Sequence, residues 1–387
     1  MFTTEMHMQF KEVLGQHQVK SRLIRSVRDG RISHAQLFFG PEGAGSLPLA
    51  IAYAQYMCCT EPVEDDACGS CPSCIKYGKL AHPDLHFVFP VVNIKGKAGR
   101  TVSDHYITEW RETVTENPYI SENQWYEVIG AANMQGLIGR SESNDVLRKL
   151  SLKSYEAPYK VLIIWLAEKM HVSAANALLK FIEEPPDRTV ILMVAEHTDQ
   201  ILPTILSRTQ RIRIGALDNE SVRRGLAARF PGDEERIEDV VRRSNGNFST
   251  AMQLMTSGEL ENEHFEEFVF LMRKSYGRDI VELHRWTERI AGWGRERLKL
   301  FLTYGLRMIR ENFMLNLKQK EITFLSQKED EFSIRFSPFI HQGNVFKMAE
   351  EFQRAIEHIG ANGYPKLVLL DLAIKNILLL KQPAPVE

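Results

Sequence analysis

The sequence predicts an α/β fold with a parallel sheet over residues 1–214, followed by an all-α remainder. Two observations carry this prediction. Up to residue 214, short apolar, β-prone runs alternate with helical patterns, and strands separated by helices indicate a parallel sheet covered on both faces. From about residue 266 the apolar residues recur at helical spacing. A chain of 387 residues suggests two or three domains at roughly 150 residues per domain.

Five runs are expected to form the strands of this sheet. Four are almost wholly apolar, and the fifth alternates polar and apolar residues, as an edge strand does. The runs are 36–39, 85–92, 161–166, 190–194 and 211–214.

Residues 93–135 interrupt the rhythm of strands and helices. The stretch is polar and rich in turn signals, so we interpret it as an insertion and expect a solvated loop with a short helix. Three cations in its first part, Lys95, Lys97 and Arg100, could touch phosphates, but three cations on a loop are weak grounds for a site.

The rest of the chain reads as helices. Residues 215–265 form a small unit with expected helices at 219–229 and 234–243, and residues 266–387 form a larger helical domain. A stripe at spacings of three and four indicates one long helix. The stripe consists of Leu298, Leu302, Leu306, Ile309, Phe313 and Leu317.

Composition excludes several classes of protein. With 48 Lys and Arg against 50 Asp and Glu, the net charge of −2 argues against coating nucleic acid, which needs excess cations. The longest apolar run, 367–380, is interrupted by Asp371 and Lys375, so we expect a buried helix and no membrane span. No secretory signal opens the sequence, and we expect a cytoplasmic protein.

A glycine-rich turn after the first strand matches part of a phosphate-binding loop. Gly40, Gly43 and Gly45 lie in the G-x-x-x-x-G pattern, which a Lys and a Ser or Thr should follow. Here Ser46 and Leu47 follow instead, so the cation for the phosphates and the hydroxyl for Mg²⁺ are missing. We therefore expect no tight binding of ATP or Mg²⁺.

The acids that should end the third strand are missing as well. The strand at 161–164 runs into Trp165 and Leu166 rather than into metal-coordinating carboxylates. Two independent losses in one nucleotide site make a simple misalignment an unsatisfactory explanation. Elsewhere, the pair Asp65 and Asp66 is expected to be solvated, and no residue set typical of a hydrolase or a polymerase is found.

Four cysteines have the spacing of a structural zinc site. Cys59, Cys68, Cys71 and Cys74 follow the pattern C-x8-C-x2-C-x2-C, and four thiolates suit a closed tetrahedral Zn²⁺ site. Cys58 is a spare that could compete with Cys59, although the spacing favours Cys59. A reducing compartment disfavours disulfides. We expect a zinc module over residues 58–84.

An ordered set of motifs resembles the clamp-loader subunits of bacterial DNA polymerase III, which are members of the AAA+ ATPase superfamily. The segment AANALLKFIEEPP at 174–186 is the most specific part of the resemblance, and LPTILSRT at 202–209 follows it. Upstream, LGQ at 14–16 and HAQLF at 34–38 are also similar. The resemblance covers residues 8–255 well and the C-terminal part weakly.

The resemblance implies an AAA+ domain with an inserted zinc module, a helical lid at 215–265 and a helical collar at 266–387. Because it lacks the Lys and the acids, the sequence resembles the delta-prime class, which does not hydrolyse ATP. The gamma/tau-type motors should retain the Lys and the acids. The expected partners are gamma/tau-type and delta-type paralogues and, through the complex, the sliding clamp and primed DNA.

Further residue roles come from the resemblance alone. Arg208, with Ser207, stands where the family projects an arginine finger into the neighbouring subunit's ATP site. The family's γ-phosphate sensor Arg has no counterpart near 246–251. The family also carries the cysteine spacing, followed by a segment like that at 82–84.

Two alternatives remain open at this stage. The first is an active gamma/tau-type clamp-loader ATPase, against which the residues at 46, 47, 165 and 166 argue. The second is a zinc-containing protein that binds single-stranded nucleic acid, which the near-neutral charge disfavours.

Overall fold

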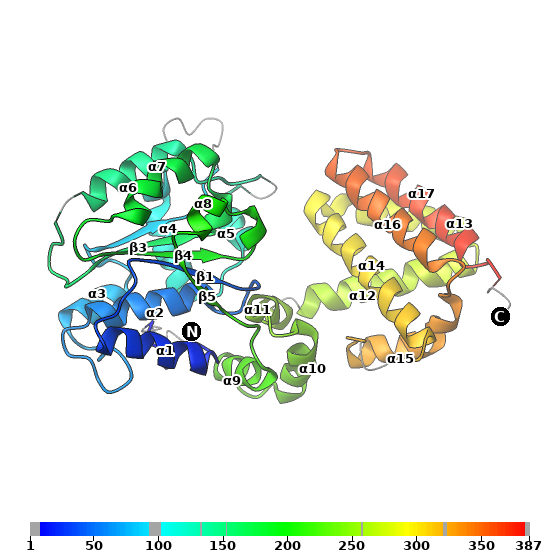
Figure 1. The fold of residues 1–387 in the computed structure, drawn as a ribbon. Coiled ribbons are helices and arrows are strands. Elements are labelled where there is room, and N and C mark those ends of the chain that lie inside the picture. The colour runs from blue at the N-terminus through cyan, green and yellow to red at the C-terminus, as the bar shows by residue number, and fades with distance from the viewer. Residues whose placement is uncertain are drawn as a thin grey trace. The chain divides into compact units, whose positions relative to one another are not determined.

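The chain divides into two compact units, Met1–Gln253 and Leu254–Glu387 (Figure 1). In this computed structural model the described residues are 8–92, 102–131, 134–151, 153–256, 258–319 and 323–383. The predicted cations of the insertion, Lys95, Lys97 and Arg100, lie outside them. The predicted domain boundaries at 214 and 265 stay predictions.

The first unit is built on a five-stranded parallel sheet, as predicted. Its strand order is β2-β3-β4-β1-β5, and every neighbouring pair is parallel. The strands are β1 Ala35–Phe39, β2 Leu85–Val88, β3 Lys160–Trp165, β4 Thr189–Ala195 and β5 Gln210–Arg213.

The second strand is shorter than the predicted run of 85–92. The backbone N–H of Phe89 donates to the Ser103 hydroxyl at 3.0 Å, and Val91 pairs with Leu137 instead of with β3. Pro90 between them has no N–H to give to a ladder. These contacts end the strand at Val88.

Helices cover both faces of the sheet, with α1, α2 and α3 on one side and α6 and α7 on the other (Figure 1). Along β3, Val161 and Ile163 enter one apolar cluster, while Leu162 and Ile164 enter the other. Each face of the strand is therefore buried, which is why its sequence is continuously apolar. The helices are α1 His17–Arg28, α2 Ser46–Cys58, α3 Pro72–Gly78, α4 Ile107–Glu116, α5 Glu122–Val128, α6 Arg140–Leu150, α7 Val172–Glu183 and α8 Pro203–Leu206, with short 3-10 turns at Ser103–Tyr106, Ala167–Lys169 and Thr198–Gln200.

The described part of the insertion is more ordered than expected, and the expectation of a mainly solvated loop is wrong there. It holds two helices, α4 and α5, rather than one. Trp110 and Trp125 are fully buried, with ring centroids 5.2 Å apart at 90°. Burial of two indoles anchors the insertion to the apolar cluster beneath the sheet.

Two helices and most of a third complete the first unit, and the first two follow the predicted ranges closely. They are α9 Asn219–Arg229, α10 Glu234–Ser244 and α11 Phe248–Thr256. Gly225 in α9 lies so close to Phe248 that an added Cβ would come within 2.7 Å of its ring. The lack of a side chain at 225 lets α11 pack directly on α9.

The second unit is all helical in its described residues. The apolar stripe predicted at 298–317 lies on α14, and Leu298, Leu302 and Ile309 are buried there. Leu317 follows the helix and is exposed. The helices are α12 Gly258–Tyr276, α13 Ile280–Ile290, α14 Arg295–Asn316, α15 Gln327–Phe336, α16 Val345–Gly360 and α17 Pro365–Leu379, with 3-10 turns at Ala291–Trp293 and Ser337–Phe339. Among the described helices, none has the length and apolarity to cross a bilayer.

Candidate functional site

The four predicted cysteines converge at the C-terminal end of α2. Their Sγ atoms all lie within 4.8 Å of one another. The measured Sγ–Sγ separations are 3.6 Å for Cys59–Cys68, 4.0 Å for Cys59–Cys71 and 3.9 Å for Cys68–Cys74. Four thiolates at about 2.3 Å from a tetrahedral Zn²⁺ would lie about 3.8 Å apart. The cluster therefore has the dimensions of such a site.

Backbone N–H groups surround the sulfurs. Cys68 N donates to Cys59 Sγ at 3.3 Å, Cys71 N to Cys68 Sγ at 3.2 Å, and Cys74 N to Cys71 Sγ at 3.4 Å. Although burial alone raises the pKa of Cys71, hydrogen bonds from Thr60 and from the Cys74 N–H outweigh it and lower the pKa to about 6. The thiolate is the form that binds a metal, so the donors to Cys71 favour metal binding at this residue, whereas burial raises the pKa of Cys59 and Cys74.

Cys58 lies outside the cluster. Its thiol is fully buried and points to the carbonyl oxygen of Tyr159 at 3.4 Å. Burial raises the pKa of Cys58 to about 12. This cysteine stays a packed thiol, and Cys59 takes the fourth position in the cluster.

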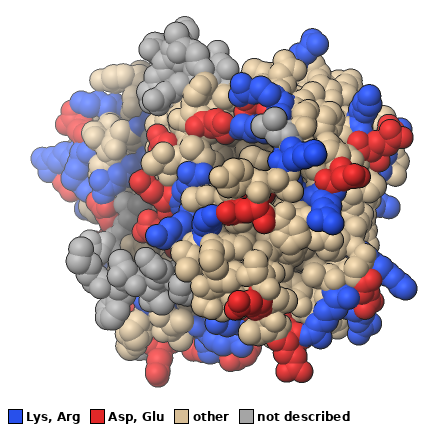
Figure 2. Space-filling view, turned by 90° about the vertical axis from the view of Figure 1, so that its left-hand side faces the viewer, with Lys and Arg blue, Asp and Glu red and all other residues tan. Residues whose placement is uncertain are grey.

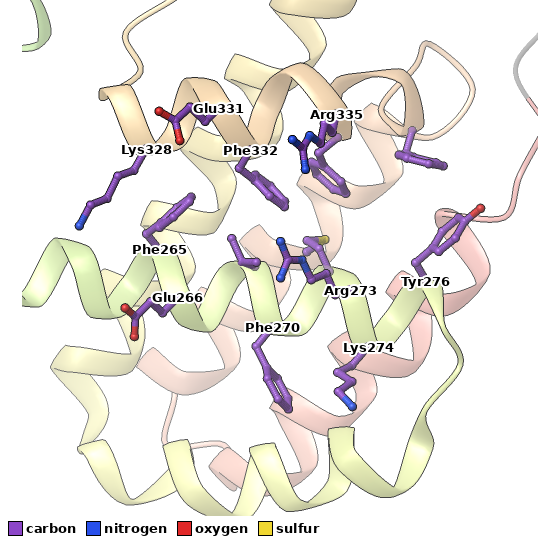
Figure 3. Close-up of a pocket in the computed structure, with 14 residues that line it drawn as sticks. Phe265, Glu266, Phe270, Arg273, Lys274, Tyr276, Lys328, Glu331, Phe332 and Arg335 are labelled. Carbon is purple, nitrogen blue, oxygen red and sulfur yellow. The ribbon is translucent and has the colours of Figure 1, made fainter.

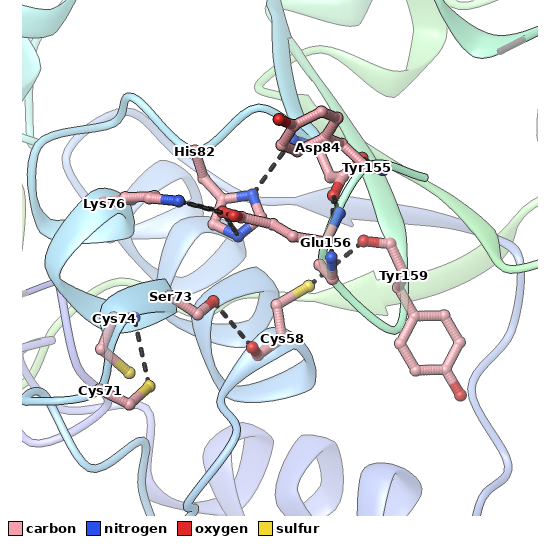
Figure 4. Close-up of polar contacts among 11 residues, drawn as sticks. Cys58, Cys71, Ser73, Cys74, Lys76, His82, Asp84, Tyr155, Glu156 and Tyr159 are labelled. Carbon is pink, nitrogen blue, oxygen red and sulfur yellow. Dashed lines mark hydrogen bonds and ion pairs between the residues drawn. The ribbon is translucent and has the colours of Figure 1, made fainter. Parts of the chain in front are cut away.

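The segment after the cluster ties it to the sheet (Figure 4). The Asp84 carboxylate accepts the backbone N–H groups of Tyr155, Glu156 and Ala157 at 2.6, 2.9 and 2.9 Å. Burial works against its charge, but these three donors lower the pKa of Asp84. His82 lies 3.3 Å from Glu156, which also pairs with Lys76 of α3. The motif at 82–84 thus joins α3 to the chain entering β3.

Asp66 corrects the expectation that the pair at 65 and 66 is solvated. Its side chain is buried, and its two oxygens accept the backbone N–H groups of Phe10 and Lys11, each at 2.9 Å. Asp65 is exposed, as expected, and pairs with Arg28 at 3.2 Å. Asp66 therefore fastens the N-terminal segment to the loop that carries the cysteines.

The phosphate-type loop lies at the other end of α2, and its glycines have structural reasons to be there. A Cβ on Gly40 would come within 2.1 Å of the Ile214 carbonyl oxygen, and one on Gly43 within 2.0 Å of Asn247. Gly45 has a φ of +92°, which favours glycine. Close packing at Gly40 and Gly43 and the positive φ of Gly45 account for the glycine pattern without a ligand.

The two residues that depart from the phosphate-loop pattern point into the protein. Leu47 is buried in the apolar cluster with the rest of α2. The Ser46 hydroxyl is buried and has no hydrogen-bond partner among the described residues. Neither side chain supplies a cation, so the first turn of α2 offers an anion only its backbone N–H groups.

A tyrosine of the insertion fills the space over this loop. Tyr119 is 4% exposed, accepts the Leu14 N–H at 2.8 Å, and lies with its ring 4.9 Å from that of Phe248. A Cβ on Gly45 would meet Tyr119 at 3.2 Å. The remaining cavity is about 30 Å³, whereas ligand pockets usually measure roughly 300–1,000 Å³. No signal in the sequence pointed to Tyr119.

One carboxyl group and no cation lie among the residues that line the same cavity. Glu196 follows β4 and lines it. Burial, together with the carboxylates of Glu42 and Glu168, raises the pKa of Glu196 to about 8. Glu168 is itself buried and accepts the Glu196 N–H at 2.8 Å. At the end of β3, Trp165 is buried 5.1 Å from the Trp110 ring. The carboxyl group at position 196 would repel a phosphate when it is ionised.

Arg208 lies on the surface just after α8. Its Nε bonds to the Glu183 carboxylate at the end of α7, and its Nη1 donates to the Thr204 carbonyl oxygen at 3.0 Å and to the Ser207 hydroxyl at 3.2 Å. The Arg208 side chain is 37% exposed. Both Glu183 and Arg208 belong to motifs found in the sequence, but their pairing was not predicted.

Comparisons with known proteins agree with this architecture. A family model described as "DNA polymerase III, delta subunit" matches residues 15–218. The chain is 28% identical over 230 residues to DNA polymerase III subunit delta' of Pseudomonas aeruginosa, which covers 59% of this chain and 58% of that protein. It is 30% identical over 207 residues to subunit delta' of Bacillus subtilis, with 54% and 50% covered.

A relative with a different subunit name is also similar. The chain is 25% identical over 251 residues to DNA polymerase III subunit tau of Bacillus subtilis, which covers 64% of this chain and 37% of that protein. The chain thus spans about half the length of the delta' relatives, 58% and 50%, and 37% of tau. Because the family model covers more than half of its residues, the chain belongs to the DNA polymerase III delta subunit family.

Proposed function

We propose that this chain is a delta-prime-type subunit of the DNA polymerase III clamp loader that does not hydrolyse ATP. In this proposal it helps the complex place the sliding clamp on primed DNA, and it lends Arg208 to the ATP site of a neighbouring subunit. The observation that carries the proposal is the cavity of about 30 Å³ over a phosphate-type loop that Tyr119 fills.

Three features of that loop support the loss of ATP binding. The Lys and hydroxyl positions hold Ser46 and Leu47, Trp165 stands where acids would hold Mg²⁺, and Glu196 adds a carboxyl group to the cavity. A triphosphate bound there would have backbone N–H groups but no cation. A gamma/tau-type motor needs the missing Lys, hydroxyl and acids. The similarity to tau is therefore best explained by a shared fold.

The surroundings of Arg208 support a role towards a neighbour. An arginine finger stabilises charge on the transferred phosphoryl group and must reach outside its own chain. Arg208 is partly exposed, and its carboxylate partner Glu183 is 45% exposed. Exposed ion pairs contribute roughly 0–1 kcal/mol, so a neighbour's phosphates could draw the guanidinium away at little cost.

The other parts of the molecule receive supporting roles in the proposal. The cysteine cluster would hold a structural Zn²⁺, because four thiolates leave no open position for catalysis. Helices α9–α11 would form the lid, and the second unit would form the collar that binds gamma/tau-type and delta-type paralogues.

Binding of single-stranded nucleic acid by the chain alone has no comparable support. On the face drawn in Figure 2, Lys and Arg side chains are interspersed with Asp and Glu rather than gathered in one field. Non-specific binding to phosphates needs a continuous cationic surface.

The test uses the clamp loader reconstituted from the full chain and its partner subunits. We expect Arg208→Ala to leave the size of the assembly unchanged and to slow hydrolysis at the one neighbouring site by about 10³-fold or more. Arg208→Lys should recover little, because an ammonium lacks the planar fork of donors. Single-turnover ATP hydrolysis measures the effect.

The matched control is Arg213→Ala, which removes an exposed arginine of β5 that lies close by in the sequence. It should leave turnover unchanged. Normal turnover in an intact Arg208→Ala assembly would refute the proposed role of this arginine.

A further inference from the structure

An open groove lies between two helices of the second unit. Its walls are α12 and α15, its volume is about 870 Å³, and it is lined mainly by apolar side chains (Figure 3). This space is far larger than the cavity over the phosphate-type loop. It falls within the range of roughly 300–1,000 Å³ that is usual for binding sites.

The floor of the groove is aromatic. Phe265 of α12 and Phe332 of α15 are partly buried, with ring centroids 5.9 Å apart, and Phe332 stacks on Phe336 at 5.0 Å. At one end, the ring of Tyr276 lies 4.8 Å from that of Phe339 and is 43% exposed. A contiguous apolar surface in contact with water gains free energy when another apolar surface covers it.

Two arginines face each other across this floor. Arg273 comes from α12 and Arg335 from α15, and Figure 3 shows both guanidinium groups directed into the space between the helices. Within the described part of the chain, neither has an ion-pair partner. Two like charges on opposite walls repel each other until an anion lies between them.

Six charged residues line the groove, and four of them are cations, so the cations outnumber the two acids, Glu266 and Glu331. Lys274 pairs with Asp279 at 2.9 Å, and Lys328 bonds to Asn262 at 3.3 Å. Glu266 points away from α15 in Figure 3. The space between the helices is thus apolar along its floor and cationic at the two arginines.

We propose that this groove binds a short acidic segment of a partner protein. Apolar side chains of the segment would lie on Phe265, Phe332 and Phe336, and one of its carboxylates would bridge Arg273 and Arg335. Arginine suits this task because its planar fork donates two parallel hydrogen bonds to a carboxylate. The proposal concerns the second unit only and does not depend on ATP binding or on Arg208.

The test begins with the full chain and a random library of 12-residue peptides displayed on phage. We expect enrichment of peptides that combine two or more large apolar residues with Asp or Glu. The best peptide is then synthesised with a fluorescent label, and its Kd is measured by anisotropy. Kd should rise about tenfold or more for Arg273→Glu combined with Arg335→Glu, because carboxylate partners would then repel.

The matched control reverses two exposed cations of α16, Lys347→Glu and Arg354→Glu, which do not line the groove. The Kd of this control variant for the peptide should stay within about twofold of that of the unmodified chain, because exposed charges far from the groove contribute little to binding. Circular dichroism and thermal melting confirm that both double variants fold.

Three results would overturn the proposal. One is the absence of any enriched peptide, and another is a neutral or basic consensus. The third is a selected peptide whose binding does not respond to Arg273→Glu and Arg335→Glu in a folded chain. Concentration-dependent dimerisation that this double variant abolishes would instead identify a second copy of the chain as the occupant.

Discussion

The two ends of helix α2 differ in what they retain. At its N-terminal end, the glycines of a phosphate-type loop keep their backbone shape, but the side chains that would hold a nucleotide are absent and Tyr119 fills the space. At its C-terminal end, four cysteines keep both side chains and geometry, with sulfurs within 4.8 Å of one another. One helix thus joins a loop whose glycines are explained by packing to a cluster of four thiols that could hold a metal ion.

The two ends of α2 show when a sequence motif indicates a bound ligand. Glycines at 40 and 43 are required by contacts with Ile214 and Asn247, so their presence needs no ligand. Four free thiols that lie close together stabilise the fold little, because a free thiol is only a weak hydrogen-bond donor. The convergence of four thiols therefore indicates a metal more strongly than the glycine pattern indicates a nucleotide.

The largest expected effect comes from the cysteine end. Cys71→Ser should abolish metal binding and destabilise the first unit by roughly 5 kcal/mol or more, since binding of a structural metal is coupled to folding. Metal content by plasma emission spectroscopy and thermal melting measure the two effects. Cys58→Ala is the control and should keep the metal, because Cys58 lies outside the cluster. Equal metal content in both variants would contradict this assignment.

A smaller effect is expected at the phosphate-type end. Tyr119→Ala should lower the free energy of unfolding by about 3 kcal/mol, because it leaves a cavity beside Phe248. Tyr119→Phe should cost only about 1 kcal/mol, because it removes just the acceptor of the Leu14 N–H. Urea denaturation gives both values.

The Tyr119→Ala variant also tests whether the tyrosine is what prevents nucleotide binding. Emptying the space does not restore the missing Lys, so Tyr119→Ala should still not bind Mg²⁺-ATP. Micromolar binding by this variant would mean that the tyrosine alone closes a site that is otherwise competent.

The smallest effect depends on pH. The native pKa of Glu196 is raised to about 8 from 4.5, so the folded chain holds a proton that the unfolded chain releases between these values. Stability from this group is therefore lost as pH rises through that window. Glu196→Gln should make the protein more stable than the unmodified chain by roughly 1–2 kcal/mol at pH 9, and by little at pH 4, where the carboxyl group is protonated in both states. Urea unfolding at both pH values tests this, and an equal difference at both would contradict it.

The sequence predicted the features that depend on local pattern. Strands β1, β3 and β4 lie within one residue of the predicted runs, because buried parallel strands are continuously apolar. The convergence of Cys59, Cys68, Cys71 and Cys74 also followed from their spacing. The metal that they would hold stays a prediction.

Features that depend on distant contacts were missed. Tyr119 reaches Leu14 across 105 residues, and Asp66 reaches Phe10 across 56. A tyrosine in a polar insertion and an aspartate in an acidic loop look like solvated residues until the fold brings their partners close. The pairing of Arg208 with Glu183 has the same origin, although each residue lies in a recognised motif.

Titration of the full chain with Mg²⁺-ATP, followed by isothermal calorimetry, measures whether the phosphate-type loop binds nucleotide. We predict no saturable binding up to about 1 mM nucleotide, which corresponds to a binding free energy weaker than about −4 kcal/mol. A micromolar Kd that Ser46→Glu abolishes would contradict it, because the loop would then hold phosphate despite Leu47 and Tyr119.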